Sequence, residues 1–222
     1  MAIPKIIHQT FKTSALPWIT KLHISGFRKK NPEYHYEFYD DSRIRKFLEL
    51  EFEKETLELY DRIQIGAAKA DFFRYAVLFK KGGVYLDIDS SIPGKLSNLI
   101  LPNDKALVSR EHNSPCYIQW ALIYEAGHPF LEKTLELMFE NIRHNKYPHD
   151  VHHVTGPTVY TTAITECLKE NPSIGYRVLN EEYDNKMKFK YRFSKFLLYN
   201  GSSGHWKKQQ ITTSVLKLDS HQ

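Results

Sequence analysis

The stretch Ile65–Ser91 reads IGAAKADFFRYAVLFKKGGVYLDIDSS and decides the fold of this chain. Its first part is largely apolar at helical spacing, and Gly82-Gly83 follow it as glycine follows a helix C-terminus. Val84–Leu86 come next and predict a short, buried strand. Asp87 and Asp89 stand directly after that strand. We therefore predict a helix, a glycine turn and a strand that ends in two acids.

The two acids at the strand end predict a metal site. Because side chains alternate along a strand, we expect Asp87 and Asp89 to leave the same face. Two like charges held side by side repel each other unless a cation lies between them, and carboxylate oxygens suit Mg2+ or Mn2+. A lone D-x-D is also a frequent chance pattern, and aspartates near turns often serve as caps.

Asp71 and Arg74 lie three residues apart on the predicted helix and share a face. An acid and a guanidinium inside so apolar a helix are costly to bury without a partner or a ligand. We therefore count both among the candidate site residues. The alternative is that they form only an ion pair within the helix.

Composition limits the class of protein. The chain has 222 residues, of which 41% are hydrophobic and 14% aromatic, so we expect one globular α/β domain over residues 1–222. The two cysteines, Cys116 and Cys167, indicate neither a disulfide framework nor a zinc cage. A net charge of +5 permits a nucleotide or an acidic membrane surface as a ligand, and scattered charge of this size disfavours nucleic acid.

Predicted strands and helices alternate along the chain, which indicates a mostly parallel sheet. Strands are expected at residues 3–7, 34–39, 84–86, 106–109, 118–124 and 177–179, and further helices at 18–30, 42–62, 130–145 and 158–168. Residues 8–12 follow the first strand, where α/β proteins place ligand loops. Residues 149–157 are expected to be a loop, residues 189–217 strands and turns, and Trp18 and Trp120 parts of the core.

The pattern A-x-x-x-D-x-x-R-Y, which starts at Ala67, and the following G-G-x-Y-x-D-x-D resemble the DXD-containing sugar transferases of glycosyltransferase family 32. They are similar, more distantly, to the catalytic domains of clostridial glucosylating toxins. Further matches to the family are Ile3–Phe11, Asn31-Pro32, Asp40-Asp41, Gly127–Pro129, Thr155–Pro157 and Gly204–Trp206. The resemblance implies a GT-A fold with a Rossmann-like, mostly parallel sheet flanked by helices. It also implies a nucleotide-sugar donor, Mn2+ or Mg2+, and transfer with retention.

The resemblance further implies roles for individual residues. Asp89 would be a direct metal ligand, and Asp87 would reach the ribose, the sugar and the metal shell. Phe11 would stack on the nucleotide base, with a place in the core as the alternative. The implied catalytic residues are Asp87, Asp89, Asp71 and Arg74, and the implied metal ligands are Asp87, Asp89 and His205. The implied donor-binding residues are His8, Gln9, Thr10, Phe11, Asp71, Arg74, Asp87, Gln119, His205 and Trp206.

The predicted function is a metal-dependent, retaining transfer of a hexose to a glycan or glycolipid. A UDP-sugar is the favoured donor and GDP-mannose the second candidate. The alternatives are a non-catalytic module that binds a nucleotide-sugar and, less favoured, a D-x-D phosphatase. A dehydrogenase is disfavoured because no G-x-G-x-x-G follows the first strand. The sequence shows neither a signal peptide nor a transmembrane run, so we expect a cytoplasmic protein, with peripheral contact to a membrane left open.

Overall fold

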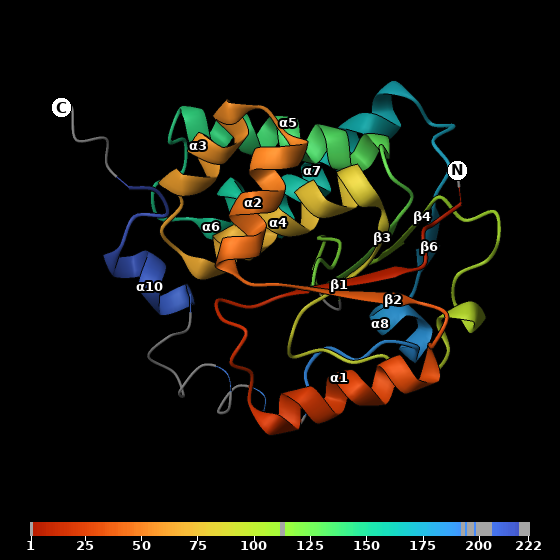
Figure 1. The fold of residues 1–222 in the computed structure, drawn as a ribbon. Coiled ribbons are helices and arrows are strands. Elements are labelled where there is room, and N and C mark those ends of the chain that lie inside the picture. Colours follow the sequence, from red (N-terminus) through yellow and green to blue (C-terminus); the bar gives the residue numbers. More distant parts are fainter. Residues whose placement is uncertain (1, 112–113, 192–193, 195–197, 199–205, 218–222) are drawn as a thin grey trace.

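A twisted sheet with helices on both faces forms the centre of the molecule (Figure 1). The computed structural model describes residues 2–111, 114–191, 194, 198 and 206–217. Within them the sheet has the strand order β2-β1-β3-β5-β4-β6. The strands are β1 (Ile6–Thr10), β2 (His35–Tyr39), β3 (Gly83–Leu86), β4 (Ala106–Ser109), β5 (Ala121–Tyr124) and β6 (Arg177–Leu179).

The direction of the strands gathers chain ends at one edge of the sheet. Strand β1 pairs in parallel with β2 and β3, and β4 pairs in parallel with β6, whereas β5 runs antiparallel to both of its neighbours. The carboxyl ends of the parallel strands therefore share an edge with the amino end of β5. The mostly parallel α/β sheet predicted from the sequence is confirmed.

Each face of the sheet has its own apolar core because successive side chains of a strand point to opposite sides. On β3, Tyr85 belongs to the core beneath α4, and Val84 and Leu86 belong to the core over α1. One face carries α1 (Trp18–Lys30) and α8 (Glu181–Asn185) (Figure 1). The other carries α2 (Asp41–Glu51), α3 (Lys54–Arg62), α4 (Gly66–Lys81), α5 (Pro129–Arg143) and α7 (Pro157–Glu170) (Figure 1). Three shorter elements are η1 (Leu96–Asn98), α6 (Val151–Val154) and α10 (Trp206–Thr212).

The glycine pair between α4 and β3 fixes how these two elements meet. Gly82 and Gly83 have φ angles of 63° and 103°, a region that side chains disfavour. A Cβ on Gly83 would lie 2.6 Å from the carbonyl oxygen of Ile6, and one on Gly82 would lie 2.7 Å from the backbone nitrogen of Ala126. Both positions therefore require glycine, as the sequence predicted for the end of this helix.

Several element predictions are wrong, each for a local reason. Residues 42–62 form two helices, because Phe52 adopts an extended conformation (φ −130°, ψ 168°) and its ring packs 4.6 Å from Lys80 Nζ. The predicted loop at 149–157 contains α6, because Asp150 caps it by accepting a hydrogen bond from the backbone N–H of His153. Residues 189–217 include the helix α10.

Two tryptophans that the sequence assigned to the core have different environments. Trp120 is 9% exposed and belongs to the core over α1, as predicted. Trp18 is 70% exposed, so its assignment to the core is wrong. It is the first residue of α1 and lies outside the buried stripe of Thr20, Ile24 and Phe27. Across the described chain, no helix combines the length and apolarity that crossing a bilayer requires.

Candidate active site

Helix α4 carries Asp71 and Arg74 on its buried side. Their residues are only 4% and 5% exposed. Arg74 reaches beyond its own helix, because it donates from Nη2 to Oδ1 of Asp87 at 3.0 Å and from Nη1 to the carbonyl oxygen of Gln119 at 2.6 Å. The same Nη2 lies 3.3 Å from Oδ1 of Asp71. The ion pair within the helix therefore exists, but it is part of a network that reaches the end of β3.

Asp71 is held by hydrogen bonds to both carboxylate oxygens. Gln119 donates from Nε2 to Oδ1 at 2.9 Å, and Thr155 donates from its hydroxyl to Oδ2 at 3.0 Å. The hydroxyl of Tyr75 donates to Oε1 of Gln119 at 2.5 Å, which fixes the orientation of that amide. Burial raises the pKa of Asp71 to about 7, although Arg74 and Thr155 act in the opposite direction. The carboxylate therefore changes charge near neutral pH.

Asp87 and Asp89 lie in a turn rather than on the strand. Strand β3 ends at Leu86, and the backbone N–H of Ser90 donates to the carbonyl oxygen of Asp87 at 2.9 Å. The premise that strand alternation relates the two side chains is therefore wrong, because both lie beyond the end of the strand. Their proximity comes from the turn instead, since the charge of Asp87 contributes to raising the pKa of Asp89.

The two acids of this turn differ in their partners. Asp87 accepts at Oδ1 from Arg74 and, at 2.9 Å, from the hydroxyl of Tyr85. Burial raises its pKa, against the effect of Arg74. Asp89 is 3% exposed, and burial together with Asp87 raises its pKa to about 6. The positive charges of Lys190 and Arg74 act in the opposite direction on Asp89.

These two carboxylates fit a divalent cation. They supply oxygen ligands of the type that Mg2+ and Mn2+ prefer, and the negative charge of Asp87 raises the pKa of Asp89. A cation between them would remove this repulsion. No group of three or more His, Cys, Asp or Glu side chains suited to a metal occurs in the described part of the chain. Within the described residues, Asp87 and Asp89 are therefore the candidate ligands of a cation at this site.

Strand β1 brings only part of its predicted residues to this site. Gln9 donates from Nε2 to the carbonyl oxygen of Asp87 at 3.1 Å, so it supports the turn. His8 is fully buried, and its Nε2 lies 3.0 Å from the carbonyl oxygen of Gly82, at the opposite end of β3. The Thr10 hydroxyl donates to the carbonyl oxygen of Tyr39 at 2.8 Å. Phe11, partly buried, is the first residue after β1.

The predicted ligand loop at residues 8–12 begins later than expected. Residues Ile6 to Thr10 pair in register with His35 to Tyr39 of β2, so the strand continues through Thr10. His205 lies outside the described residues. Trp206 begins α10, and Gln210 of that helix accepts from the backbone N–H of Val151 at 3.1 Å. This places α10 beside α6, whose C-cap residue is Thr155.

Sequence reasoning missed three hydroxyl groups that shape the site. Tyr85 binds Asp87, Tyr75 orients Gln119, and Thr155 binds Asp71. The sequence did contain signals for them. Both tyrosines are part of the A-x-x-x-D-x-x-R-Y…G-G-x-Y-x-D-x-D pattern, and Thr155 opens the Thr-Gly-Pro match.

Comparison with known proteins agrees with this geometry. Residues 19–107 match the family described as the glycosyltransferase sugar-binding region containing the DXD motif. An uncharacterized glycosyltransferase of Acanthamoeba polyphaga mimivirus is 33% identical over 184 residues, which cover 82% of this chain and 72% of that protein. The chain belongs to the DXD glycosyltransferase family. It is a glycosyltransferase, as the sequence predicted.

Other relatives of this glycosyltransferase are longer. Inositol phosphoceramide mannosyltransferase 3 of Schizosaccharomyces pombe is 30% identical over 217 residues, which cover 92% of this chain and 56% of that protein. The chain thus spans little more than half the length of this yeast relative.

Solved structures show the fold. The glycosyltransferase PaToxG superposes with a TM-score of 0.64 at 21% identity, covering 98% of this chain and 82% of its own. The UDP-bound glycosyltransferase domain of the YGT toxin gives a TM-score of 0.57 at 11% identity, covering 82% and 81% of the two chains. The GT-A fold predicted from the sequence is confirmed.

Proposed function

We propose that this glycosyltransferase transfers a hexose from a nucleotide-sugar to a glycan or glycolipid, with a divalent cation held by Asp87 and Asp89. The observation that carries the proposal is the convergence of one guanidinium, the buried Asp71 and Asp89, and the half-buried Asp87 at the end of β3. Buried like charges destabilise a fold unless they bind something, and ionisable clusters of this kind mark functional sites.

In the proposed reaction the residues of α4 hold the donor sugar. Arg74 would donate to sugar hydroxyls from the side of its guanidinium that faces Asp87. Asp71, whose two oxygens already accept hydrogen bonds, would accept from a further hydroxyl as a carboxylate. Gln119 lies beside both and would position the reacting centre. The role of Phe11 against the base remains a proposal, supported by its place just beyond the carboxyl end of β1.

When bound, Mn2+ or Mg2+ would neutralise the negative charge that develops on the departing diphosphate. His205 and Trp206 are proposed to approach the diphosphate from the C-terminal segment. The carboxylates beside the sugar would favour the positive charge that develops at its anomeric carbon. We propose retention of configuration: the bond from that carbon to the diphosphate breaks, and the acceptor oxygen bonds to the carbon on the same face. The proton of the acceptor hydroxyl passes to the departing diphosphate.

Two donors are candidates. The sequence favoured a UDP-sugar, and a fold neighbour is described as UDP-bound. Relatives named as mannosyltransferases at up to 30% identity over most of this chain favour mannose instead. Sequence relatives at this identity weigh more than a fold neighbour at 11%, so we place GDP-mannose beside the UDP-hexoses as a donor to be tested first.

We propose that the acceptor binds at the same edge of the sheet. A hollow of about 510 Å³ lies at the ends of β4 and β6 and is lined mainly by polar side chains, among them Arg110, Asn180 and Asn185. Amide and guanidinium groups suit the hydroxyls of a sugar. Strand β4 is two positions from β3 in the sheet, so this hollow and the acids open on one edge.

A nucleotide-release assay tests the proposal. GDP-mannose and UDP-hexoses are offered with Mn2+, with Mg2+ and with a chelator, using the full chain. We expect release with one class of donor, loss of release with chelator, and its recovery on adding metal back. Release that is indifferent to chelator, or that persists unchanged in Asp89→Asn, would refute the assignment of the metal to these acids.

A further inference from the structure

Helix α1 lies on the face of the sheet away from α4 (Figure 1). Its solvent-facing side carries both apolar and basic side chains. Trp18 is 70% exposed and Leu22 is 59% exposed. They are four residues apart, so they lie on one side of the helix. Lys29, also exposed, falls on the same side, and the exposed Lys21 flanks it. Large apolar side chains that adjoin one another at the surface indicate an interaction site.

The positive charge of the protein is concentrated in this part of the chain. Residues 1–32 contain six basic residues and no Asp or Glu, whereas the whole chain has a net charge of +5. The other 190 residues therefore carry a net charge of −1. The six residues are Lys5, Lys12, Lys21, Arg28, Lys29 and Lys30. Within this stretch, Lys21 and Lys29 lie exposed on or beside the side of α1 that carries Trp18 and Leu22, where they complement a negative surface.

We propose that α1 docks on a bilayer that contains anionic phospholipid. A helix that lies in the interface combines an apolar side with Lys and Arg around it, and tryptophan favours the level of the headgroups. Trp18 and Leu22 enter the headgroup region, and Lys21 and Lys29 contact lipid phosphates. The long aliphatic stems of the lysines allow their ammonium groups to reach those phosphates from the flank of the helix.

The helix that docks is directly connected to the metal site. The hydroxyls of Thr20 and Tyr191 are hydrogen-bonded at 2.6 Å, and the ring of His23 stacks on that of Tyr191 with centroids 4.0 Å apart. The backbone N–H of Tyr191 donates to the carbonyl oxygen of Asp89 at 2.9 Å. Docking of α1 therefore places the acids close to the bilayer surface. From this position we infer that the acceptor is carried by a lipid. The inference about the acceptor rests on the proposed function, whereas the docking of α1 does not.

Co-sedimentation with vesicles tests the docking without donor or metal. We expect the full chain to bind vesicles of phosphatidylcholine with phosphatidylserine, to bind pure phosphatidylcholine weakly, and to dissociate as salt is raised. Trp18→Ser with Leu22→Ser should weaken binding by about tenfold or more. Lys21→Gln with Lys29→Gln should weaken it by about fivefold per residue. The matched control is Leu50→Ser with Lys146→Gln, which changes an exposed residue of α2 and an exposed residue after α5 and should have no effect.

Fluorescence locates the contact. Brominated lipid should quench tryptophan emission in the wild-type chain, and Trp18→Phe should lose most of that quenching while still binding. The docking is overturned if neutral and anionic vesicles bind alike, if the α1 and control variants behave alike, or if the α1 variants only convert a dimer to a monomer. Donor hydrolysis in solution should be equal in wild-type and α1 variants, so failure of the docking and failure of the proposed function are told apart.

Discussion

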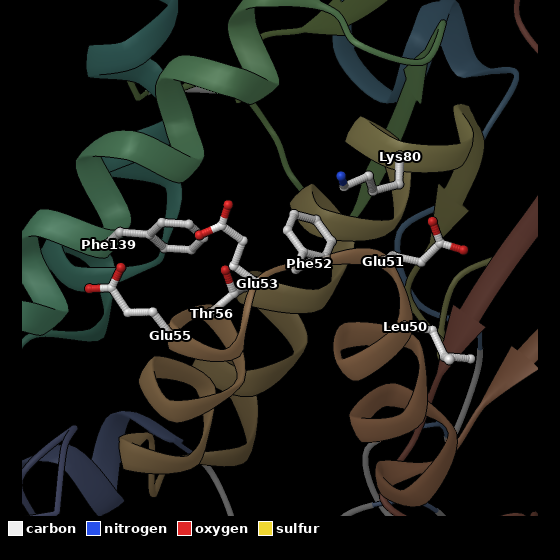
Figure 2. Close-up of a pocket in the computed structure, with 8 residues that line it drawn as sticks. All are labelled: Leu50, Glu51, Phe52, Glu53, Glu55, Thr56, Lys80 and Phe139. Atoms are coloured by element: carbon white, nitrogen blue, oxygen red, sulfur yellow. The ribbon is translucent and has the colours of Figure 1, made fainter.

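Two groups of acids near opposite ends of α4 behave differently. At the end of β3 the acids are Asp71, Asp87 and Asp89, and the first and last of them are less than 5% exposed. The second group lies in a hollow of about 420 Å³ (Figure 2). This hollow is bounded by α4, by α5 and by the segment that joins α2 to α3. Its exposed acids are Glu51, Glu53 and Glu55, which lie beside Phe52, Phe139 and Lys80.

The difference between the two groups is solvation. Burial raises the pKa of Asp71, whereas Arg143 lowers the pKa of the exposed Glu55 by hydrogen bonding to it. In water, an acid beside a base is an ordinary surface pair of small value. In the protein interior, each charge needs an opposite charge or hydrogen bonds to offset its loss of water. A buried charge without such partners indicates a ligand. Acidic residues near aromatic rings therefore mark a site only when they are buried.

The largest effect should come from removing the buried guanidinium between Asp71 and Asp87. Arg74→Met leaves Asp71 and Asp87 facing each other without compensation, so we expect a loss of about 3–5 kcal/mol in the free energy of unfolding. Arg143→Met removes the partner of Glu55 at the surface and should change the urea midpoint little. Urea denaturation of both variants makes the measurement, and equal losses would remove the distinction drawn here.

Activity should depend on the acids of one group only. Asp89→Asn and Asp87→Asn are expected to lower the rate of nucleotide release by about 100-fold or more, since charge stabilisation of the leaving group is lost. Glu53→Gln, in the other group, should keep wild-type rates. Circular dichroism establishes that each variant is folded. A Glu53 variant as inactive as the Asp89 variant would contradict the assignment.

Thr155 should matter as a positioning residue for Asp71. Thr155→Val removes the hydroxyl that donates to Oδ2. We expect a fall of about tenfold in kcat/KM, as for a hydrogen bond to a charged group. Because that bond favours the carboxylate form, its loss should also move the acidic limb of the pH–rate profile to higher pH. Thr155→Ser keeps the hydroxyl and should restore both values. An unchanged profile in Thr155→Val would argue against the role.

The two groups should also differ in how their contributions to stability respond to pH. The pKa of Asp71 is about 7 in the folded chain and near 3.8 when unfolded. Between these values the folded state holds a proton that the unfolded state has released, so this group's contribution to stability falls as pH rises from 4 to 7. The contribution of Glu55 has the opposite direction, since its pKa is lowered on folding.

Thermal unfolding of metal-free protein across this pH range makes the comparison. Relative to wild type, Asp71→Asn should lose the decrease in stability that accompanies rising pH between 4 and 7. Glu55→Gln should instead lose an increase in stability with rising pH in the acidic range. The stability of each variant relative to wild type is plotted against pH. If the two plots slope in the same direction, burial does not distinguish Asp71 from Glu55.

Local chemistry predicted the centre of the fold well, because α4, Gly82-Gly83 and β3 agree in period, capping and burial. Prediction from local sequence failed where contacts between residues distant in sequence determine the structure. No glycine or proline marks the break at Phe52, which comes from packing against Phe47 and Lys80. Hydrophobic periodicity also does not indicate the direction of a strand, so it could not predict that β5 is antiparallel to β3.

The candidate site shows the same division. The sequence predicted four residues of the site, because charged side chains within an apolar stretch can be recognised from the sequence alone. They are Asp71, Arg74, Asp87 and Asp89. The turn that brings Asp87 and Asp89 together was not, since the strand ends one residue before the first acid. That residues 1–222 form one domain stays a prediction.

The close contact between Gly83 and Ile6 has a consequence for genetics. Strand β3 is four residues long, so any shift at its first residue is carried to its last, about 10 Å away, with little slack to absorb it. A single methyl group at Gly83, placed 2.6 Å from a carbonyl oxygen, would therefore displace Asp87 from the opposite end of the strand. An inactivating allele could thus arise at a position that touches no substrate, and screens for lost transferase activity should recover it alongside changes in the acids themselves.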